Sequence, residues 1–231
     1  GIAHCVLGGI GAAVYFERVH GWAWLEPLYG ALAAALLAAL VIGYASLRAR
    51  ERMDTVIGAV WAVGMAAGIV LISLTPGYTS DLMSYLFGNI LMVTDADLWL
   101  LAGLDVVVLV VVALFHRQLL AVCFDPEFAG LRGVRVNRYY FLLLLLTALT
   151  VVVLVSVVGI ILVIALLTLP AAVANHHMHR LGRMMVAATA ITIVLTAGGL
   201  FLSYGPDLPS GAVTILLAGF LFILSSMLRR R

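Results

Sequence analysis

Apolar segments of about 20 residues recur along this chain, and they constrain its fold more than any other feature. A helix needs about 20 apolar residues to cross about 30 Å of hydrocarbon. Hydrophobic residues make up 65% of the 231 residues, against about 45–50% in a soluble domain. The sequence therefore predicts an all-α, polytopic transmembrane helix bundle. The predicted segments are 2–16, 28–47, 55–74, 98–115, 139–157, 159–174, 184–203 and 211–228.

A further apolar run, residues 82–93, is too short to span the membrane as a helix, and we expect a re-entrant half-helix there. The arginines support this topology. If the eight long segments cross and 82–93 does not, every arginine except Arg18 falls on one side. The positive-inside rule makes that side cytoplasmic. The arginines on it are Arg48, Arg50, Arg52, Arg117, Arg132, Arg135, Arg138, Arg180, Arg183, Arg229, Arg230 and Arg231.

The chain shows no soluble domain and no long linker, so we predict a single transmembrane domain over residues 1–231. The small residues of Gly64-x-x-x-Gly68 suit close packing between helices in lipid. Cys5 and Cys123 are expected at different membrane depths, so we expect no disulfide between them. The first apolar run is short and residue 1 is Gly. We therefore expect the chain to lack an N-terminal span of a longer parent.

A polar island at residues 124–128, Phe-Asp-Pro-Glu-Phe, separates two apolar spans. Asp125 can cap a helix, Pro suits the first helical position, and Glu complements the helix dipole. This pattern predicts a short cytoplasmic helix at about 124–133 that a soluble partner grips; the alternative is an ordinary capped loop. The sequence contains no lysine, so the chain cannot hold a phosphate loop, which requires lysine. A partner that hydrolyses ATP must therefore supply the nucleotide site.

Several motifs together carry a family resemblance. Residues 81–91, DLMSYLFGNIL, resemble the signature of the permeases of zinc, manganese and iron ABC importers. In the same order follow FDPEFAGLRGV at 124–134, VGIILVIALLTLPAAVA at 158–174 and DLPSGAVTILLAG at 207–219. AHCVL at 3–7 is also similar, so the resemblance covers nearly the whole chain.

The resemblance implies a multi-pass permease in the bacterial inner (plasma) membrane. The implied function is the import of a divalent transition-metal ion by alternating access. Zinc is the expected ion, with manganese or iron as alternatives. The implied partners are a second copy of the chain, two cytoplasmic ATP-binding subunits and an extracytoplasmic metal-binding receptor, and no nucleic acid. No enzymatic activity and no permanently bound cofactor are expected, because ATP binds in the partner subunits. The residues expected to couple to the ATPase are Phe124, Asp125, Pro126, Glu127, Phe128 and Leu131.

Four residues are candidates for the metal pathway. His4 offers an imidazole at membrane depth, which suits Zn(II) or Mn(II); the alternative is a histidine hydrogen-bonded within the bundle or lying close to a truncated end. Asp105 lies inside a span, where a carboxylate costs about 2.5–3.5 kcal/mol, so we expect it to face a cavity, pair, or be protonated. Asp81 is expected to cap a helix on the outer side and to offset its positive end. Asn89 offers an amide oxygen, for metal or for a helix–helix hydrogen bond.

The group His176, His177 and His179 is expected in a solvated cytoplasmic loop, with acceptance of exiting metal as the alternative. Two further functions stay open: a permease for a metal chelate, and a secondary transporter with Asp105 and His4 as relay groups. An intramembrane enzyme is disfavoured because the H-E-x-x-H and G-x-S-x-G motifs are absent from the sequence. The available ligand types suit zinc, manganese and iron alike, so they do not identify the transported metal.

Overall fold

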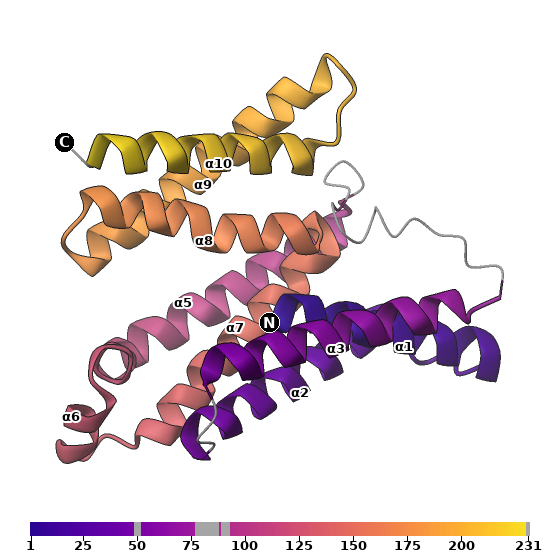
Figure 1. Ribbon diagram of the computed structural model, residues 1–231, viewed down its shortest axis with the longest axis horizontal. Helices are drawn as coiled ribbons and strands as arrows, with labels where there is room; N and C mark the ends of the chain where they lie inside the picture. The colour runs from indigo at the N-terminus through magenta and orange to yellow at the C-terminus, as the bar shows by residue number, and fades with distance from the viewer. Residues whose placement is uncertain (49–51, 77–87, 89–92, 230–231) are drawn as a thin grey trace. The chain divides into compact units, whose positions relative to one another are not determined.

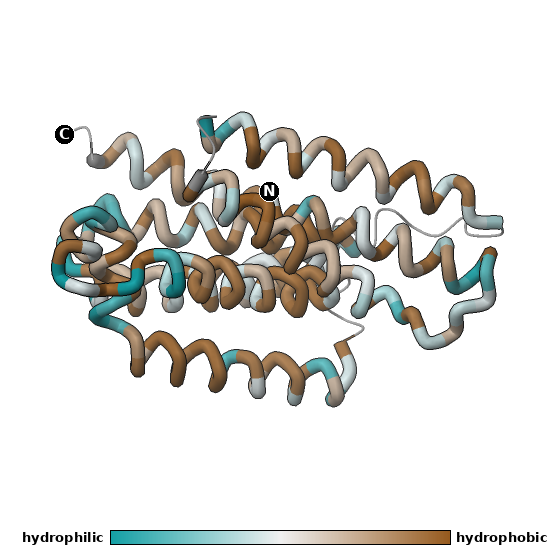
Figure 2. The backbone as a smooth tube through the Cα atoms, turned by 90° about the horizontal axis from the view of Figure 1, so that it is seen from below, coloured by the Kyte–Doolittle hydropathy of each residue, from teal (hydrophilic) through white to brown (hydrophobic). Residues whose placement is uncertain are grey.

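The computed structural model describes residues 1–48, 52–76, 88 and 93–229, and these residues form helices without any strand. Eight helices in the described part are long and apolar enough to cross a membrane, which confirms the predicted all-α bundle. Figure 2 shows brown, apolar residues along the helices and teal, polar residues near their connections. The helices, shown in Figure 1, are α1 (Ile2–His20), α2 (Pro27–Arg48), α3 (Met53–Ser73), α5 (Asp95–Phe124), α6 (Pro126–Leu131), α7 (Val136–Val158), α8 (Ile160–His177), α9 (Leu181–Tyr204) and α10 (Ser210–Arg229).

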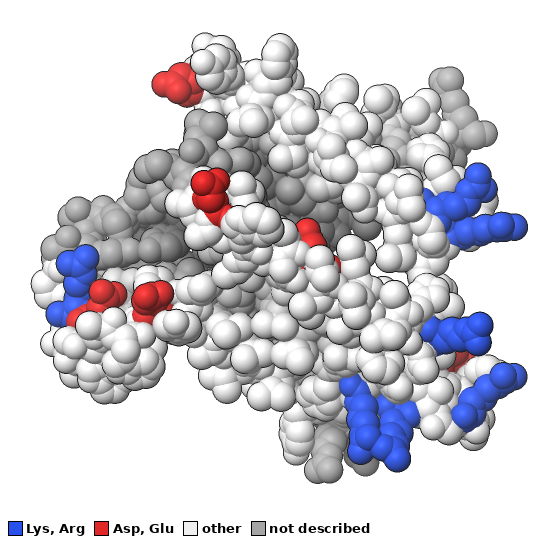
Figure 3. Space-filling model, turned by 180° about the vertical axis from the view of Figure 1, so that it is seen from behind, with Lys and Arg blue, Asp and Glu red and all other residues white. Residues whose placement is uncertain are grey.

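The chain divides into two compact units, and each is described by itself. The first holds residues 1–80 and 94–154, and the second holds residues 81–93 and 155–231. The expectation of a single domain stays a prediction. Figure 3 shows that most of the visible surface is neither basic nor acidic and that the charged side chains stand in separate small groups.

In the first unit, glycines bring α1 close to α2 and α3. A Cβ added to Gly8 would lie 2.6 Å from the carbonyl oxygen of Gly64, and one added to Gly11 would lie 2.6 Å from that of Gly68. A Cβ on Gly9 would overlap α2 in the same way. Because apolar contact gives little drive in lipid, such backbone contact is what holds transmembrane helices together. The structure thus confirms that the Gly64-x-x-x-Gly68 pattern marks a helix–helix contact.

Helix α5 is longer than its predicted segment. It begins with a capping box in which the Thr94 hydroxyl accepts from the Asp97 backbone N–H at 3.3 Å and the Asp97 carboxylate accepts from the Thr94 N–H at 3.0 Å. A helix of 30 residues is about 45 Å long, more than the hydrocarbon thickness. The apolar pattern stops near Phe115, where the backbone is non-helical (φ −108°, ψ 16°) and the helix kinks. Beyond the kink the polar residues 116–118 and the apolar residues 119–124 stay helical and extend the chain toward α6.

In the second unit, α8, α9 and α10 pack against one another. Gly199 of α9 lies so close to the buried Thr214 of α10 that a Cβ there would overlap it. Gly88 belongs to the same unit and has φ 68°, a left-handed conformation that favours glycine. A Cβ on Gly88 would overlap the backbone at Val158 and Gly159. The rest of the expected half-helix up to residue 92, with Asp81 and Asn89, lies outside the described residues.

Candidate metal path and coupling helix

His4 lies in the first turn of α1, with its ring edge-on to Trp61 of α3 and the two ring centroids 5.1 Å apart. Trp61 stands roughly 12 Å along the axis of α3 from its first residue, Met53. The arginine pattern predicts that α3 begins at the cytoplasmic surface. With that orientation, this contact is expected to place His4 within a hydrocarbon core about 30 Å thick.

The Nδ1 atom of His4 is buried and has no hydrogen-bond partner among the described residues. A buried polar atom left without a partner costs about 1–3 kcal/mol. In the tautomer with its proton on Nε2, Nδ1 presents a lone pair, which is the form in which imidazole binds transition metals. The alternative of a histidine already satisfied within the bundle has no support at Nδ1 in the described part of the chain.

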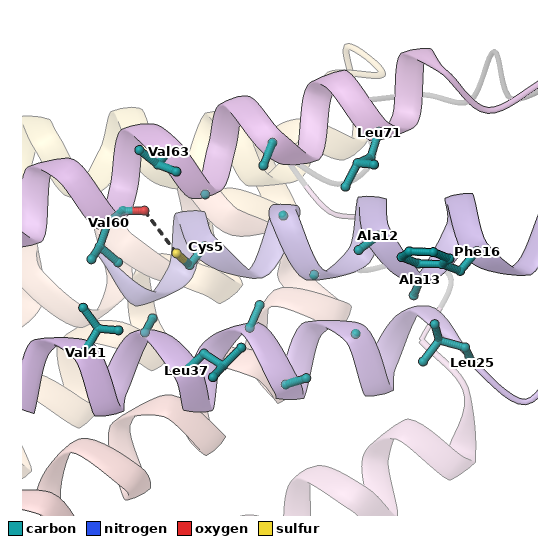
Figure 4. Close-up of a pocket in the computed structure, with 18 of the residues that line it drawn as sticks. Cys5, Ala12, Ala13, Phe16, Leu25, Leu37, Val41, Val60, Val63 and Leu71 are labelled. Carbon is teal, nitrogen blue, oxygen red and sulfur yellow. Dashed lines mark hydrogen bonds between the residues drawn. The ribbon is translucent and has the colours of Figure 1, made fainter.

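Cys5 has a different environment from His4. Its thiol donates a hydrogen bond to the carbonyl oxygen of Val60 in α3, with Sγ and O 3.1 Å apart. Cys5 also lines an apolar groove of about 810 Å³ between α1, α2 and α3, whereas His4 is not one of the lining residues (Figure 4). The two neighbours therefore do not converge on one site.

Asp105 is the other candidate for the metal path that lies among the described residues. Asp105 is exposed on α5 and forms no hydrogen bond or ion pair with a described residue. Among the described residues, no group of three or more His, Cys, Asp or Glu side chains could hold a metal ion. The described residues thus bring no such cluster together, and the assignment of His4 to the metal path stays a prediction.

Helix α6 forms where the polar island predicts a short helix. Asp125 is its N-cap, and its carboxylate accepts a hydrogen bond from the backbone N–H of Phe128 at 2.9 Å. Pro126 takes the first turn, and Gly133 follows the helix with φ 79°. The three apolar side chains expected as anchors are largely exposed, at 75% for Phe124, 51% for Phe128 and 87% for Leu131.

Large apolar side chains gathered at an exposed, charged end of a protein mark a surface for another macromolecule. Ala129 is the buried residue of α6. One side of the helix therefore packs against its own chain, and its other side chains are exposed. The sequence predicts this helix but not one contact on it. The Arg132 guanidinium lies over the Phe128 ring, 4.9 Å from its centroid, at the i+4 spacing that pairs side chains on a helix.

The histidines near the end of α8 correct an expectation. His176 and His177 do not lie in a solvated loop but form the last turn of α8. His176 Nδ1 lies 2.9 Å and His177 Nε2 lies 3.0 Å from the buried Ser225 hydroxyl of α10. The apolar pattern ended before them, and the buried hydroxyl that stabilises the extra turn belongs to a distant segment. His179 is exposed beyond the helix.

Eight helices that are long and apolar enough to cross a membrane indicate a multi-pass membrane protein. Comparison with known proteins specifies it further. The model of the ABC 3 transport family matches residues 1–229, and the chain belongs to this family. The resemblance to permeases of metal-ion ABC importers is thereby confirmed.

Individual relatives agree with this family. An uncharacterized membrane protein of Synechocystis is 43% identical over 230 residues, covering 100% of this chain and 79% of that protein. The manganese import system permease protein ScaB of Streptococcus gordonii is 34% identical, covering 97% of this chain and 78% of ScaB. The structure of PsaBC from Streptococcus pneumoniae in complex with Fab matches 96% of this chain and 79% of that chain, with a TM-score of 0.79 and 32% identity.

Proposed function

We propose that this chain is the membrane-spanning subunit through which an ATP-driven importer passes a divalent transition-metal ion into the cytoplasm. The observation that carries the proposal is the buried Nδ1 of His4, which has no partner among the described residues and lies beside Trp61 on apolar helices of a chain of the ABC 3 transport family. Ionisable side chains at that depth are expensive and functional.

Manganese is the first metal to test, because a relative that matches most of the chain is named a manganese import permease. The sequence alone put zinc first, and imidazole suits both ions. A closed tetrahedral site of Cys and His would trap zinc. One imidazole, completed by water or by oxygen ligands, holds either ion weakly enough to release it, as a transit site requires.

In this proposal two copies of the chain form the pathway, an extracytoplasmic receptor delivers the ion, and two cytoplasmic ATPase subunits drive alternating access. The ATPase grips α6 through Phe124, Phe128 and Leu131, whose exposure supports the assignment. The capped start of α6 fixes the direction in which those side chains stand. Force applied to α6 passes into α5, which lies directly before it in the chain and packs against it.

The experiment is uptake of radioactive manganese by the complete complex of permease, ATPase subunits and receptor, with zinc and iron as competitors. His4→Ala should lower manganese uptake about tenfold or more while the complex still assembles. His20→Ala is the matched control, because His20 lies on the same helix but is exposed at its other end. Uptake that survives His4→Ala would remove His4 from the path, and uptake without the ATPase subunits would contradict the proposal as a whole.

A further inference from the structure

A cavity of about 360 Å³ opens in the first unit, between α5, α7 and the loop that follows α6. The function proposed above does not use it. It lies on the arginine-rich side that the charge pattern assigns to the cytoplasm. Its polar lining comes from Gln118, Arg132, Arg135, Arg138 and Tyr139.

The lining is built to hold an anion. It contains three guanidinium groups, an amide and a phenol, and no carboxylate. Within the described residues the one ion pair is Arg52–Asp54, so none of the three cavity arginines is neutralised by a described acidic group. Guanidinium forks match the oxygens of a phosphate or carboxylate through paired hydrogen bonds.

The backbone does not supply this site. The N–H of Gly133 donates to the Gly130 carbonyl at 3.0 Å, and the N–H of Val134 donates to the Ala129 carbonyl at 3.0 Å. These two amides are therefore occupied in ending α6 and do not bind an anion. The side chains of the cavity are its main donors, and replacing them weakens the site without changing these two hydrogen bonds.

The position of the cavity selects the class of anion. Gln118 of α5 lies just beyond the predicted apolar segment 98–115, and Tyr139 of α7 is the first residue of the predicted apolar segment 139–157. One turn before Gln118, the Leu114 side chain is 69% exposed on α5. Donors at the end of an exposed apolar surface fit a molecule with an anionic head and hydrocarbon tails. Basic pockets between transmembrane helices on the cytoplasmic side bind such lipid headgroups.

We propose that this cavity binds the phosphate headgroup of an anionic phospholipid of the inner leaflet. The bound headgroup also holds Arg132, whose guanidinium lies over the Phe128 ring of α6. An occupied cavity therefore steadies the face of α6 that carries Phe128. This last consequence rests on the proposed function of α6, whereas lipid binding itself does not.

The test is a titration of the purified permease–ATPase complex with phosphatidylglycerol and, separately, with phosphatidylcholine, followed by native mass spectrometry. The test variant is the double replacement Arg135→Gln with Arg138→Gln, which leaves Arg132 and Phe128 in place. The matched control is Arg180→Gln with Arg183→Gln, which removes the same charge from another cytoplasmic turn. We expect phosphatidylglycerol to bind more tightly than phosphatidylcholine. The test variant should lose roughly 30-fold in phosphatidylglycerol affinity, and the control should keep the wild-type value.

Four outcomes would overturn the proposal. An equal loss in both double variants would show only general attraction to a basic surface. Competition by inorganic phosphate at the same concentration as lipid would show a site for a free anion. Unchanged lipid binding together with loss of the ATPase subunits would show that the arginines contact acidic groups of the ATPase. If the double variant does not fold, Tyr139→Phe replaces it as the test variant. Unchanged lipid affinity in Tyr139→Phe, with an unchanged melting temperature, would also refute the site.

The titration does not depend on transport. A permease that carried no metal would still bind the lipid if the cavity is a headgroup site. Failure of the proposed function and failure of this site are therefore distinguishable.

Discussion

Helix α1 and the segment formed by α5 and α6 are held in place in opposite ways. Helix α1 is fixed by tertiary packing: Val6 and Leu7 are fully buried, and glycines bring its backbone against α2 and α3. Most of α5 is exposed, with Leu119 and Val122 as its buried residues. Helix α6 is fixed mainly by local capping at Asp125. The same chain thus contains one packed helix and one largely unpacked segment.

Under the proposed function, this difference separates two tasks. A side chain that binds a metal ion through a nitrogen at a fixed depth in the membrane needs rigid surroundings. His4 lies on the packed helix α1. A surface that must meet lipid, a second subunit or an ATPase has to remain uncovered until its partner arrives, as α5 and α6 are. Low packing in this segment is what a contact surface requires in the isolated chain.

The largest expected effect comes from filling the glycine contact of α1. A Cβ at Gly64 would lie 2.8 Å from the Cα of Cys5, and neither backbone can move away alone. Gly64→Leu should therefore lower the free energy of unfolding by about 3 kcal/mol or more. The measurement is the midpoint temperature of unfolding of the purified protein in detergent.

The matched control is Gly103→Leu, because a Cβ at Gly103 of α5 meets nothing within 4 Å. It should leave the midpoint near that of the wild type. If both variants have the same midpoint temperature of unfolding, the contrast between a packed α1 and an uncovered α5 is wrong.

A smaller effect is expected at the exposed anchors of α6. Phe128→Ala removes an apolar anchor and the stacking of Arg132, and Glu127→Arg reverses a charge beside it. Each should weaken association with the ATPase subunits about tenfold or more, since exposed side chains contribute to binding and little to the fold. Co-purification of the subunits from detergent extracts measures the association.

Phe220→Ala provides the comparison variant, because Phe220 is exposed at mid-span on α10. It should retain full association. Retained ATPase binding in Phe128→Ala and Glu127→Arg would mean that α6 is not the coupling element.

Much of this arrangement follows from the sequence, for identifiable reasons. Span length and the placement of arginine predict the eight helices, and the Asp125-Pro126-Glu127 pattern predicts α6, because these signals are local. The contacts of His4 with Trp61 and of His176 with Ser225 could not be predicted. Each joins residues far apart in the chain, and no local pattern encodes which helix faces which.

The length of α5 was missed for a different reason. Three polar residues, 116–118, interrupt its apolar run, and the apolar residues 119–124 beyond them continue the helix outside the predicted segment. The Thr94-x-x-Asp97 capping signal was present in the sequence and would have located the other end of this helix. Local capping signals were thus the more reliable guide to helix ends than hydropathy.

The smallest expected effect concerns the local capping that holds α6. Asp125→Ala removes the carboxylate that accepts from the Phe128 N–H and should cost about 1 kcal/mol of helix stability. Hydrogen exchange of the α6 backbone amides should then become roughly fivefold faster, while exchange in α1 stays slow. Asp125→Asn keeps an oxygen that can cap and should restore most of the protection. If Asp125→Ala leaves α6 exchange unchanged, packing rather than capping holds α6, and α6 resembles α1 instead of differing from it.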